Sequence, residues 1–132
     1  MSWTSVDPDQ PALGTSTIAP LIFASQHDLY AALLQGAIDP MTSDPRTLDM
    51  LSMLIGFVEP KVIVEVGTYR GIGTVAMAET LRFHNLHGHI WTCDPFDYDV
   101  PDLLQKTGLS DYVTYIRGRF EALLEHLPGP MD

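Results

Sequence analysis

The feature that most constrains the fold of this chain is the stretch VIVEVGTYRGIGT, residues 62–74. It opens with a β-branched run that is apolar on both faces, which is typical of a central strand in a parallel sheet. Glu65 interrupts the run, and a turn with three glycines follows, at Gly67, Gly71 and Gly73. Because glycines let a backbone approach a ligand closely, the stretch predicts a ligand site at the end of a strand.

Strands and helices alternate along the rest of the chain. Helices are expected over 26–38, 45–58, 73–83, 101–108 and 120–129, and strands over 61–67, 89–94 and 112–118. This alternation predicts an α/β fold with a parallel sheet and right-handed crossovers.

Asp44-Pro45 predicts the start of the helix at 45–58, because a capping side chain precedes a proline at the first helical position. The predicted buried stripe of this helix is Leu48, Leu51, Ile55 and Val58.

The composition narrows the classes of partner. The 132 residues suffice for one domain with a core, and no apolar run reaches the roughly 20 residues of a membrane span. The formal net charge of -10 disfavours nucleic acids and anionic membranes, whose phosphates it repels. Cys93 is the single cysteine and the start of the chain is unlike a signal peptide, so a cytoplasmic location is expected.

Three regions are predicted. Residues 1–20 are rich in Pro, Ser, Thr and Asp and are expected to form a flexible arm, and 21–60 are expected to form helices that act as a lid. Residues 61–132 hold three β-α units, and the chain ends at Asp132, where a fourth strand is expected. A three-stranded sheet leaves the most apolar strand unpaired on one side. We therefore expect either a fragment or a protein completed by another chain. A homo-oligomer is one way in which another chain could complete it.

The chemistry of the turn at Glu65 favours a cationic ligand. The spacing Gly67, Gly71, Gly73 departs from the dinucleotide fingerprint G-x-G-x-x-G, and the phosphate-loop pattern is absent. A carboxylate two residues before the first glycine repels a pyrophosphate but suits the ammonium group of an amino acid. An NAD-type protein is therefore the weaker alternative.

Two further turns lie at the same edge of the predicted sheet and suit a nucleoside. Asp94 ends the strand at 89–94, where a carboxylate accepts hydrogen bonds from ribose hydroxyls. Gly118, Arg119 and Phe120 follow the next strand and offer backbone N–H groups and an aromatic face to an adenine. Ribose, adenine and an amino-acid ammonium together describe S-adenosylmethionine.

These motifs also carry a resemblance. VIVEVGTYRGIGTVAMAETL, IWTCDPFD and VTYIRGRFEALLEHLPGPMD resemble the front half of a class I S-adenosylmethionine-dependent methyltransferase. Within that superfamily the chain is most similar to small-molecule O-methyltransferases of the catechol and caffeoyl-CoA kind and to relatives near cephalosporin hydroxylase. The resemblance covers roughly residues 38–132 and implies a Rossmann-like sheet with the first three β-α units of the fold.

The resemblance implies a role for each matching residue. Glu65, Gly67, Tyr69 and Gly71 would line the methionine end of the cofactor, Asp94 would hold the ribose, and Gly118 to Phe120 would flank the adenine. Met41 matches a methionine that lies near the sulfonium in catechol-type enzymes, with ordinary packing as its alternative. The full set of predicted cofactor contacts is Glu65, Gly67, Thr68, Tyr69, Gly71, Gly73, Asp94, Pro95, Gly118, Arg119, Phe120 and Met41.

Two departures limit what the resemblance implies. Gly73 stands where catechol-type enzymes usually have a serine, and the metal ligands and catalytic residues of those enzymes follow strands that are not in this chain. No catalytic residue is therefore assigned. His84, His87 and His89 near Cys93 match no zinc spacing, so no metal is expected.

The predicted function is methyl transfer from S-adenosylmethionine to a small molecule by the complete protein, with oxygen as the expected acceptor atom. The alternative is a cofactor-binding fragment or partner subunit without catalysis of its own.

Overall fold

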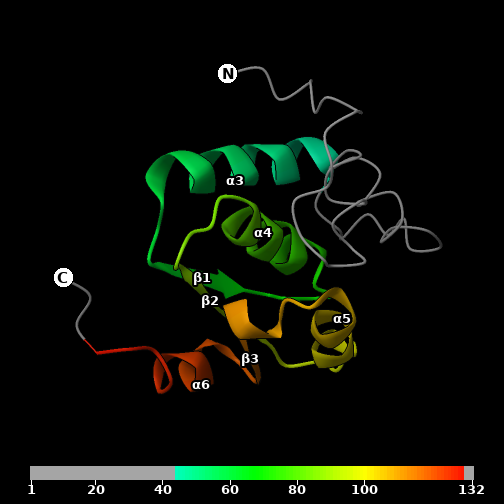
Figure 1. Cartoon of the computed structure of the whole chain (residues 1–132). Coiled ribbons are helices and arrows are strands. Elements are labelled where there is room, and N and C mark those ends of the chain that lie inside the picture. Colours follow the sequence, from blue (N-terminus) through cyan, green and yellow to red (C-terminus); the bar gives the residue numbers. More distant parts are fainter. Residues whose placement is uncertain (1–43, 130–132) are drawn as a thin grey trace. The chain divides into compact units, whose positions relative to one another are not determined.

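The computed structural model describes residues 44–129 of the chain (Figure 1). The arm at 1–20, the helix at 26–38 and Met41 lie outside these residues, so their predictions stay as predictions. The elements in order are α3 (Pro45–Val58), β1 (Val62–Val66), α4 (Ile72–Phe83), β2 (His89–Asp94), α5 (Val100–Thr107), the short 3-10 helix η1 (Ser110–Tyr112), β3 (Val113–Arg117) and α6 (Phe120–Leu124).

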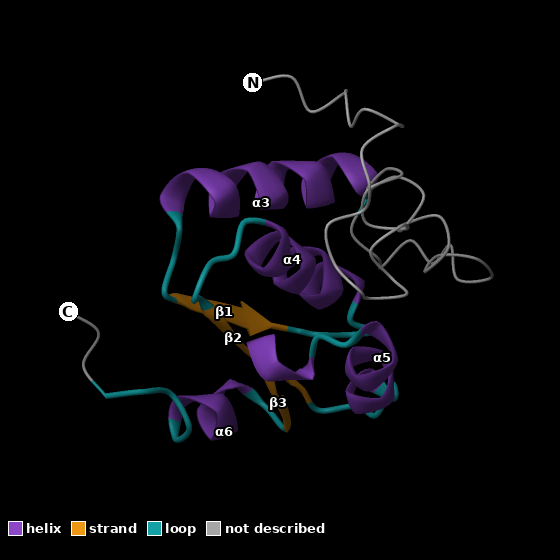
Figure 2. Cartoon of the chain, in the orientation of Figure 1, coloured by secondary structure: helices purple, strands orange, loops and turns teal. Residues whose placement is uncertain are grey.

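The three strands form one parallel sheet in the order β1-β2-β3 (Figure 2). In the register, Glu65 of β1 lies beside Thr92 of β2, and Asp94 of β2 lies beside Arg117 of β3. The parallel α/β fold predicted from the alternation and the Rossmann-like sheet that the resemblance implies are therefore both confirmed. The strand predicted at 89–94 has the predicted bounds.

β1 is not a central strand in the sheet that the structure describes. It lies at the edge, and among residues 44–129 only β2 pairs with it. Val64 is 40% exposed and Val66 is 62% exposed. The prediction of a central strand relied on apolar residues on both faces of β1. The face that carries Val64 and Val66 is open within the described residues. Separately, one edge of β1 has no paired strand there, as expected from the sequence.

α3 begins as its sequence predicts. The Asp44 carboxylate accepts hydrogen bonds from the backbone N–H groups of Arg46 and Thr47, and Pro45 occupies the first turn. The helix ends at Val58, and its C-cap Glu59 has a left-handed backbone and donates its N–H to the carbonyl of Ile55. The side chain and the backbone thus each satisfy part of a helix terminus.

The buried face of α3 differs from the predicted stripe. Leu48, Ser52 and Ile55 are buried, and the hydroxyls of Ser52 and of Thr80 in α4 are hydrogen bonded at 2.9 Å. Val58, which was predicted to be buried, is 64% exposed. At 100° per residue it lies roughly 90° from the face that meets α4. Periodicity alone therefore placed the stripe slightly off the true contact face.

The core lies between the sheet and the helices. α4 is its main helix, and Val75, Ala78 and Leu81 are fully buried there. Ile90 of β2 and Leu123 of α6 are also fully buried, and Figure 1 shows α4 and α6 on opposite sides of the sheet. α6 covers only the first half of the helix predicted at 120–129.

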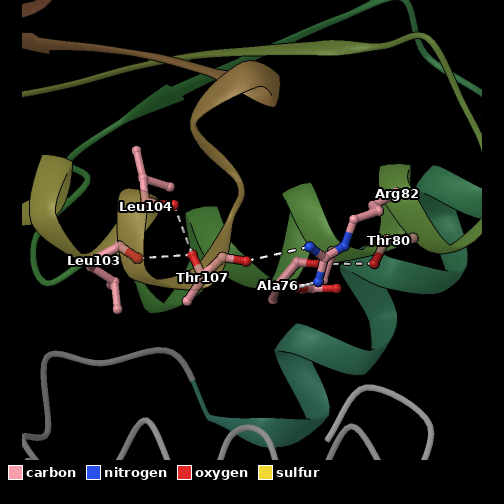
Figure 3. A network of polar contacts seen from close by, with 7 residues as sticks. Ala76, Thr80, Arg82, Leu103, Leu104 and Thr107 are labelled. Atoms are coloured by element: carbon pink, nitrogen blue, oxygen red, sulfur yellow. Dashed lines mark hydrogen bonds and ion pairs between the residues drawn. The ribbon is translucent and has the colours of Figure 1, made fainter. Parts of the chain in front are cut away.

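A polar network joins α4 to the end of α5 (Figure 3). The Arg82 guanidinium pairs with Glu79 and donates to the carbonyl of Thr107. The Thr107 hydroxyl in turn donates to the carbonyls of Leu103 and Leu104. This network links the C-terminal ends of the two helices that follow the first two strands.

Candidate cofactor site

The turns that follow the three strands meet at one edge of the sheet. The backbone N–H groups of Gly67 and Thr68 donate to the carbonyl of Cys93 at 2.9 and 3.1 Å. On the other side, Gly118 N–H donates to the carbonyl of Asp94 at 2.9 Å. The first and third turns are therefore tied by backbone hydrogen bonds to the end of β2, where the predicted ribose carboxylate lies.

Glu65 lies in the middle of this arrangement and is partly buried. Its Oε2 accepts hydrogen bonds from the hydroxyls of Thr74 and Thr92, each at 2.6 Å. Burial raises the pKa of the Glu65 carboxyl, the two threonine hydroxyls act in the opposite direction, and the charge of Asp94 adds to the rise. Because burial disfavours the ionised form of Glu65, that form depends on the hydrogen bonds that the two threonines donate.

Asp94 is 6% exposed and is held by the backbone. Its Oδ2 accepts from the N–H of Tyr69 at 2.8 Å, and its Oδ1 accepts from the N–H of Phe96 at 2.9 Å. Each carboxylate oxygen has two lone pairs, so each retains capacity for one further donor. A pair of ribose hydroxyls is a donor set of the right kind.

The first turn has a backbone conformation that favours glycine. Gly67 has φ of 89° and Gly71 has φ of 82°, and both values lie in the left-handed region. A Cβ on Gly71 would also lie 3.2 Å from Leu103 of α5. Tyr69 takes a φ of 51° between them, and this conformation aims its N–H at Asp94. The glycines therefore allow the turn to reach the end of β2.

Aromatic side chains gather beside this turn. The Tyr69 ring packs edge-on against Tyr98 with centroids 4.8 Å apart, and the Arg70 guanidinium lies 5.6 Å from the Tyr69 centroid. Phe96 is 64% exposed and contacts Tyr98 at 6.4 Å between centroids. Pro95, just before it, is exposed. Sequence reasoning singled out Tyr69 and Pro95 here but missed Tyr98 and Phe96.

The third turn is more open. Arg119 and Phe120 are exposed, with Phe120 at 42%, and Gly118 lies closely against Ala122 of α6. Their position at the carboxyl end of β3 agrees with the predicted adenine end. No contact in the described residues tests that role, so it stays a prediction.

Thr68 differs from the other predicted residues in what it contacts. It is 4% exposed, and its hydroxyl is hydrogen bonded to that of Thr92. Its side chain thus belongs to the layer beneath the turn. Gly73 lies close to Glu65 Oε1, and a Cβ on Gly73 would be 3.2 Å from that oxygen.

Sequence reasoning missed Thr74 and Thr92, which hold Glu65. A signal was present, because an acid inside an apolar strand needs donors, and Thr92 lies on the same strand face as Asp94 two residues later. Which hydroxyls reach Glu65 depends on strand register and helix placement, and neither is written in the local pattern.

Among residues 44–129 no three His, Cys, Asp or Glu side chains gather as a metal site would require. His89 Nε2 is hydrogen bonded to the Thr114 hydroxyl, and Cys93 is buried with a free thiol. None of the helices in this range has the length and hydropathy of a membrane span.

Comparisons with known proteins agree with this geometry. Residues 64–132 match the family model described as a methyltransferase domain. The cofactor-bound structure of Rv0187 from MTB has a TM-score of 0.63 and 19% identity, and the match covers 86% of this chain and 53% of that one. The SAH-bound methyltransferase PaMTH1 from Podospora anserina has a TM-score of 0.64 and 23% identity, and the match covers 76% of this chain and 44% of that one.

A candidate caffeoyl-CoA O-methyltransferase from Staphylococcus aureus has a TM-score of 0.60 and 21% identity, and the match covers 76% of this chain and 47% of that one. These identities show a shared fold, and the chain spans about half the length of the solved structures it matches. No curated protein matches the sequence. Because the family model covers more than half of its residues, the chain belongs to the methyltransferase-domain family.

Proposed function

We propose that this chain provides the S-adenosylmethionine site of a methyltransferase that acts on a small molecule, with an oxygen as the acceptor atom. Bound at this edge of the sheet, S-adenosylmethionine would supply an electrophilic sulfonium methyl group. The contribution of the described residues is to bind and orient the cofactor, which lowers the entropic part of the barrier to in-line transfer.

The observation that carries the proposal is the pair of carboxylates at the ends of adjacent strands. Glu65 and Asp94 lie on either side of a glycine turn, and each keeps hydrogen-bonding capacity after its protein contacts are counted. An ammonium group suits Glu65 and ribose hydroxyls suit Asp94. Only a ligand with both groups uses both carboxylates, and S-adenosylmethionine is such a ligand.

The same pair disfavours a dinucleotide. A pyrophosphate at the glycine turn would lie against the Glu65 carboxylate, which repels it, and the net charge of -10 adds to the repulsion. The cofactors of the similar solved structures point the same way, since one is named as SAH-bound.

Completion of the sheet is part of the proposal. β1 has an unpaired edge within the described residues, and one of its faces, with Val64 and Val66, is also exposed. We propose that a further strand pairs with this edge in the active protein, supplied by a longer chain or by a second chain. The acceptor site and any catalytic base would come with it, and the cytoplasmic setting expected from the single buried thiol belongs to the same proposal.

Calorimetric titration of S-adenosylhomocysteine into the 132-residue chain tests the cofactor assignment, with NAD as the competing ligand. We expect binding of S-adenosylhomocysteine, no binding of NAD, and loss of binding in Asp94→Ala. Asp97→Ala is the matched control, because Asp97 is an exposed carboxylate in the same turn that pairs with Arg117.

Circular dichroism of each variant reports whether it is folded. A folded parent chain that binds NAD in preference to S-adenosylhomocysteine would contradict the proposal. Equal loss of binding in Asp97→Ala would show that the acidic turn acts as a whole, without a specific role for Asp94.

A further inference from the structure

Three buried threonines form a chain of hydroxyls linked through the Glu65 carboxylate. Thr74 and Thr92 bond Glu65 directly, and Thr68 bonds Thr92. Thr74 and Thr92 have no exposed surface, and Thr68 is 4% exposed. Thr74 comes from the first turn of α4, Thr92 from β2 and Thr68 from the glycine turn. A buried hydroxyl needs a partner, and each of these three finds its partner within the chain of hydroxyls or at Glu65.

Counting protons gives the hydroxyl chain a direction. An ionised carboxylate only accepts, so Thr74 and Thr92 must each donate their single proton to Glu65 Oε2. Thr92 then has no proton left for Thr68, and the hydrogen bond between their hydroxyls requires Thr68 to donate. When the carboxyl is ionised, Thr74 and Thr92 therefore donate to Glu65, and Thr68 donates to Thr92.

The other oxygen of Glu65 is left for a ligand. Oε1 receives no hydrogen bond from residues 44–129, whereas Oε2 receives two. A Cβ on Gly73 would lie 3.2 Å from Oε1, so the glycine leaves space next to this oxygen. The arrangement saturates one oxygen and keeps the other open on the side of the glycine turn.

We propose that Thr74 and Thr92 are positioning residues that hold Glu65 so that Oε1 binds the ammonium group of the cofactor, with Thr68 supporting Thr92. This inference rests on the proposed function and extends it to residues that touch no ligand themselves. Its consequence is selective: the amino-acid end of the cofactor depends on the threonines, and the nucleoside end does not.

The surroundings of Glu65 explain why positioning requires two donors. Burial favours the neutral carboxyl, and Asp94 at the end of β2 repels the ionised form. No cation is among the causes that shift the pKa of Glu65 in the described residues. The threonine hydroxyls are therefore the groups that favour ionisation, which an ammonium partner needs.

The test compares two ligands that differ only at the amino-acid end. S-adenosylhomocysteine carries the ammonium group, and 5′-methylthioadenosine lacks the whole amino-acid portion. We expect Thr92→Val and Thr74→Val each to weaken S-adenosylhomocysteine about tenfold, because hydrogen bonds to charged groups have roughly that effect. Binding of 5′-methylthioadenosine should change less than about twofold. Thr92→Ser should restore the parent ratio of affinities.

Thr80→Val is the matched control. Thr80 is a buried threonine on α4, the helix that also carries Thr74. Its hydroxyl bonds the carbonyl of Ala76 (Figure 3) and the hydroxyl of Ser52, and neither contact involves Glu65. Thr80→Val should leave the ratio of affinities for S-adenosylhomocysteine and 5′-methylthioadenosine unchanged. Equal weakening of both ligands by Thr92→Val would overturn the positioning role, because a merely structural residue affects both.

A second measurement needs no cofactor. The carboxyl carbon of Glu65, assigned by its loss in Glu65→Gln, is titrated by NMR in the parent and in Thr92→Val and Thr74→Val. We expect higher midpoints in both variants because the ionised form loses a donor. Unchanged midpoints would overturn the inference even if the chain binds neither ligand. Higher midpoints in a chain that binds neither would support the hydroxyl arrangement and would refute the proposed function alone.

Discussion

The two carboxylates of the site are held in different ways. Glu65 is held by side-chain hydroxyls from α4 and β2, whereas Asp94 is held by backbone N–H groups of the turns that contain Tyr69 and Phe96. Burial raises the pKa of Glu65. The position of the Glu65 carboxylate therefore depends on the side chains at two other positions. The position of the Asp94 carboxylate depends on the backbone conformation of two turns.

This difference predicts how each carboxylate responds to substitution. Backbone donors remain when neighbouring side chains change, so substitutions around Asp94 should leave the position of its carboxylate unchanged. The donors of Glu65 are two threonines, and either is removed by a single substitution. Removal of the Asp94 carboxylate should affect both folding and binding, because it is the acceptor of two backbone N–H groups. Removal of the Glu65 charge should affect mainly binding.

The largest effect is expected for Asp94→Ala. It removes the acceptor of two backbone N–H groups, and this should lower the free energy of unfolding by about 2–4 kcal/mol. Urea unfolding followed by circular dichroism measures the change. Asp94→Asn, which keeps one acceptor oxygen, should lose less. A loss below about 0.5 kcal/mol in Asp94→Ala would show that the two turns hold their shape without the carboxylate.

Glu65→Gln should separate binding from stability. Loss of a buried charge partner weakens ionic recognition by about 2 kcal/mol or more, so affinity for S-adenosylhomocysteine should fall roughly 30-fold. The threonine hydroxyls still find an acceptor in the amide oxygen, so the fold should be retained. Calorimetry gives the affinity and urea unfolding the stability. A variant that binds as the parent does would remove Glu65 from the site.

The pH dependence of stability gives the sign of the Glu65 contribution. Its pKa in the folded state is raised above the ordinary value of 4.5, so its stabilising contribution is complete below about pH 4.5 and is lost as the pH rises through the folded-state pKa. The stability of Glu65→Gln relative to the parent should therefore increase over that window. Unfolding curves at pH 4 to 8 measure it, and an opposite slope would contradict the raised pKa.

The smallest effect is expected for Val66→Ser. Val66 follows Glu65 on β1 but lies on the other face, where it is 62% exposed. The change in unfolding free energy should stay within about 0.5 kcal/mol, as for other exposed positions. Urea unfolding of the 132-residue chain is the measurement. A loss above about 1 kcal/mol would show that this face is covered, which would remove the contrast between the two faces of β1.

Several features could be predicted from local patterns. The N-cap at Asp44 and the bounds of β2 follow from residue types and spacing. The parallel sheet follows from the alternation of strands and helices. The carboxyl ends of parallel strands share one edge, so the sequence alone predicts that Glu65 and Asp94 lie near each other.

Other features depended on longer-range contacts. The contact face of α3 includes Ser52, since Ser52 meets Thr80, and it leaves Val58 exposed. β1 is apolar on both faces, but its burial depends on which strands and helices lie beside it. Periodicity indicates that a face is apolar and does not identify what covers it.

By itself the sequence determined the order of elements, the glycine turn and the presence of a carboxylate at the end of each of the first two strands. These features depend on residues close together in the chain, whose backbone preferences act locally. Only the tertiary structure decided which hydroxyls hold Glu65, because Thr74 and Thr92 lie 9 and 27 residues away from it in sequence. Their meeting requires the register of β1 with β2 and the placement of α4, and packing of the whole unit sets both.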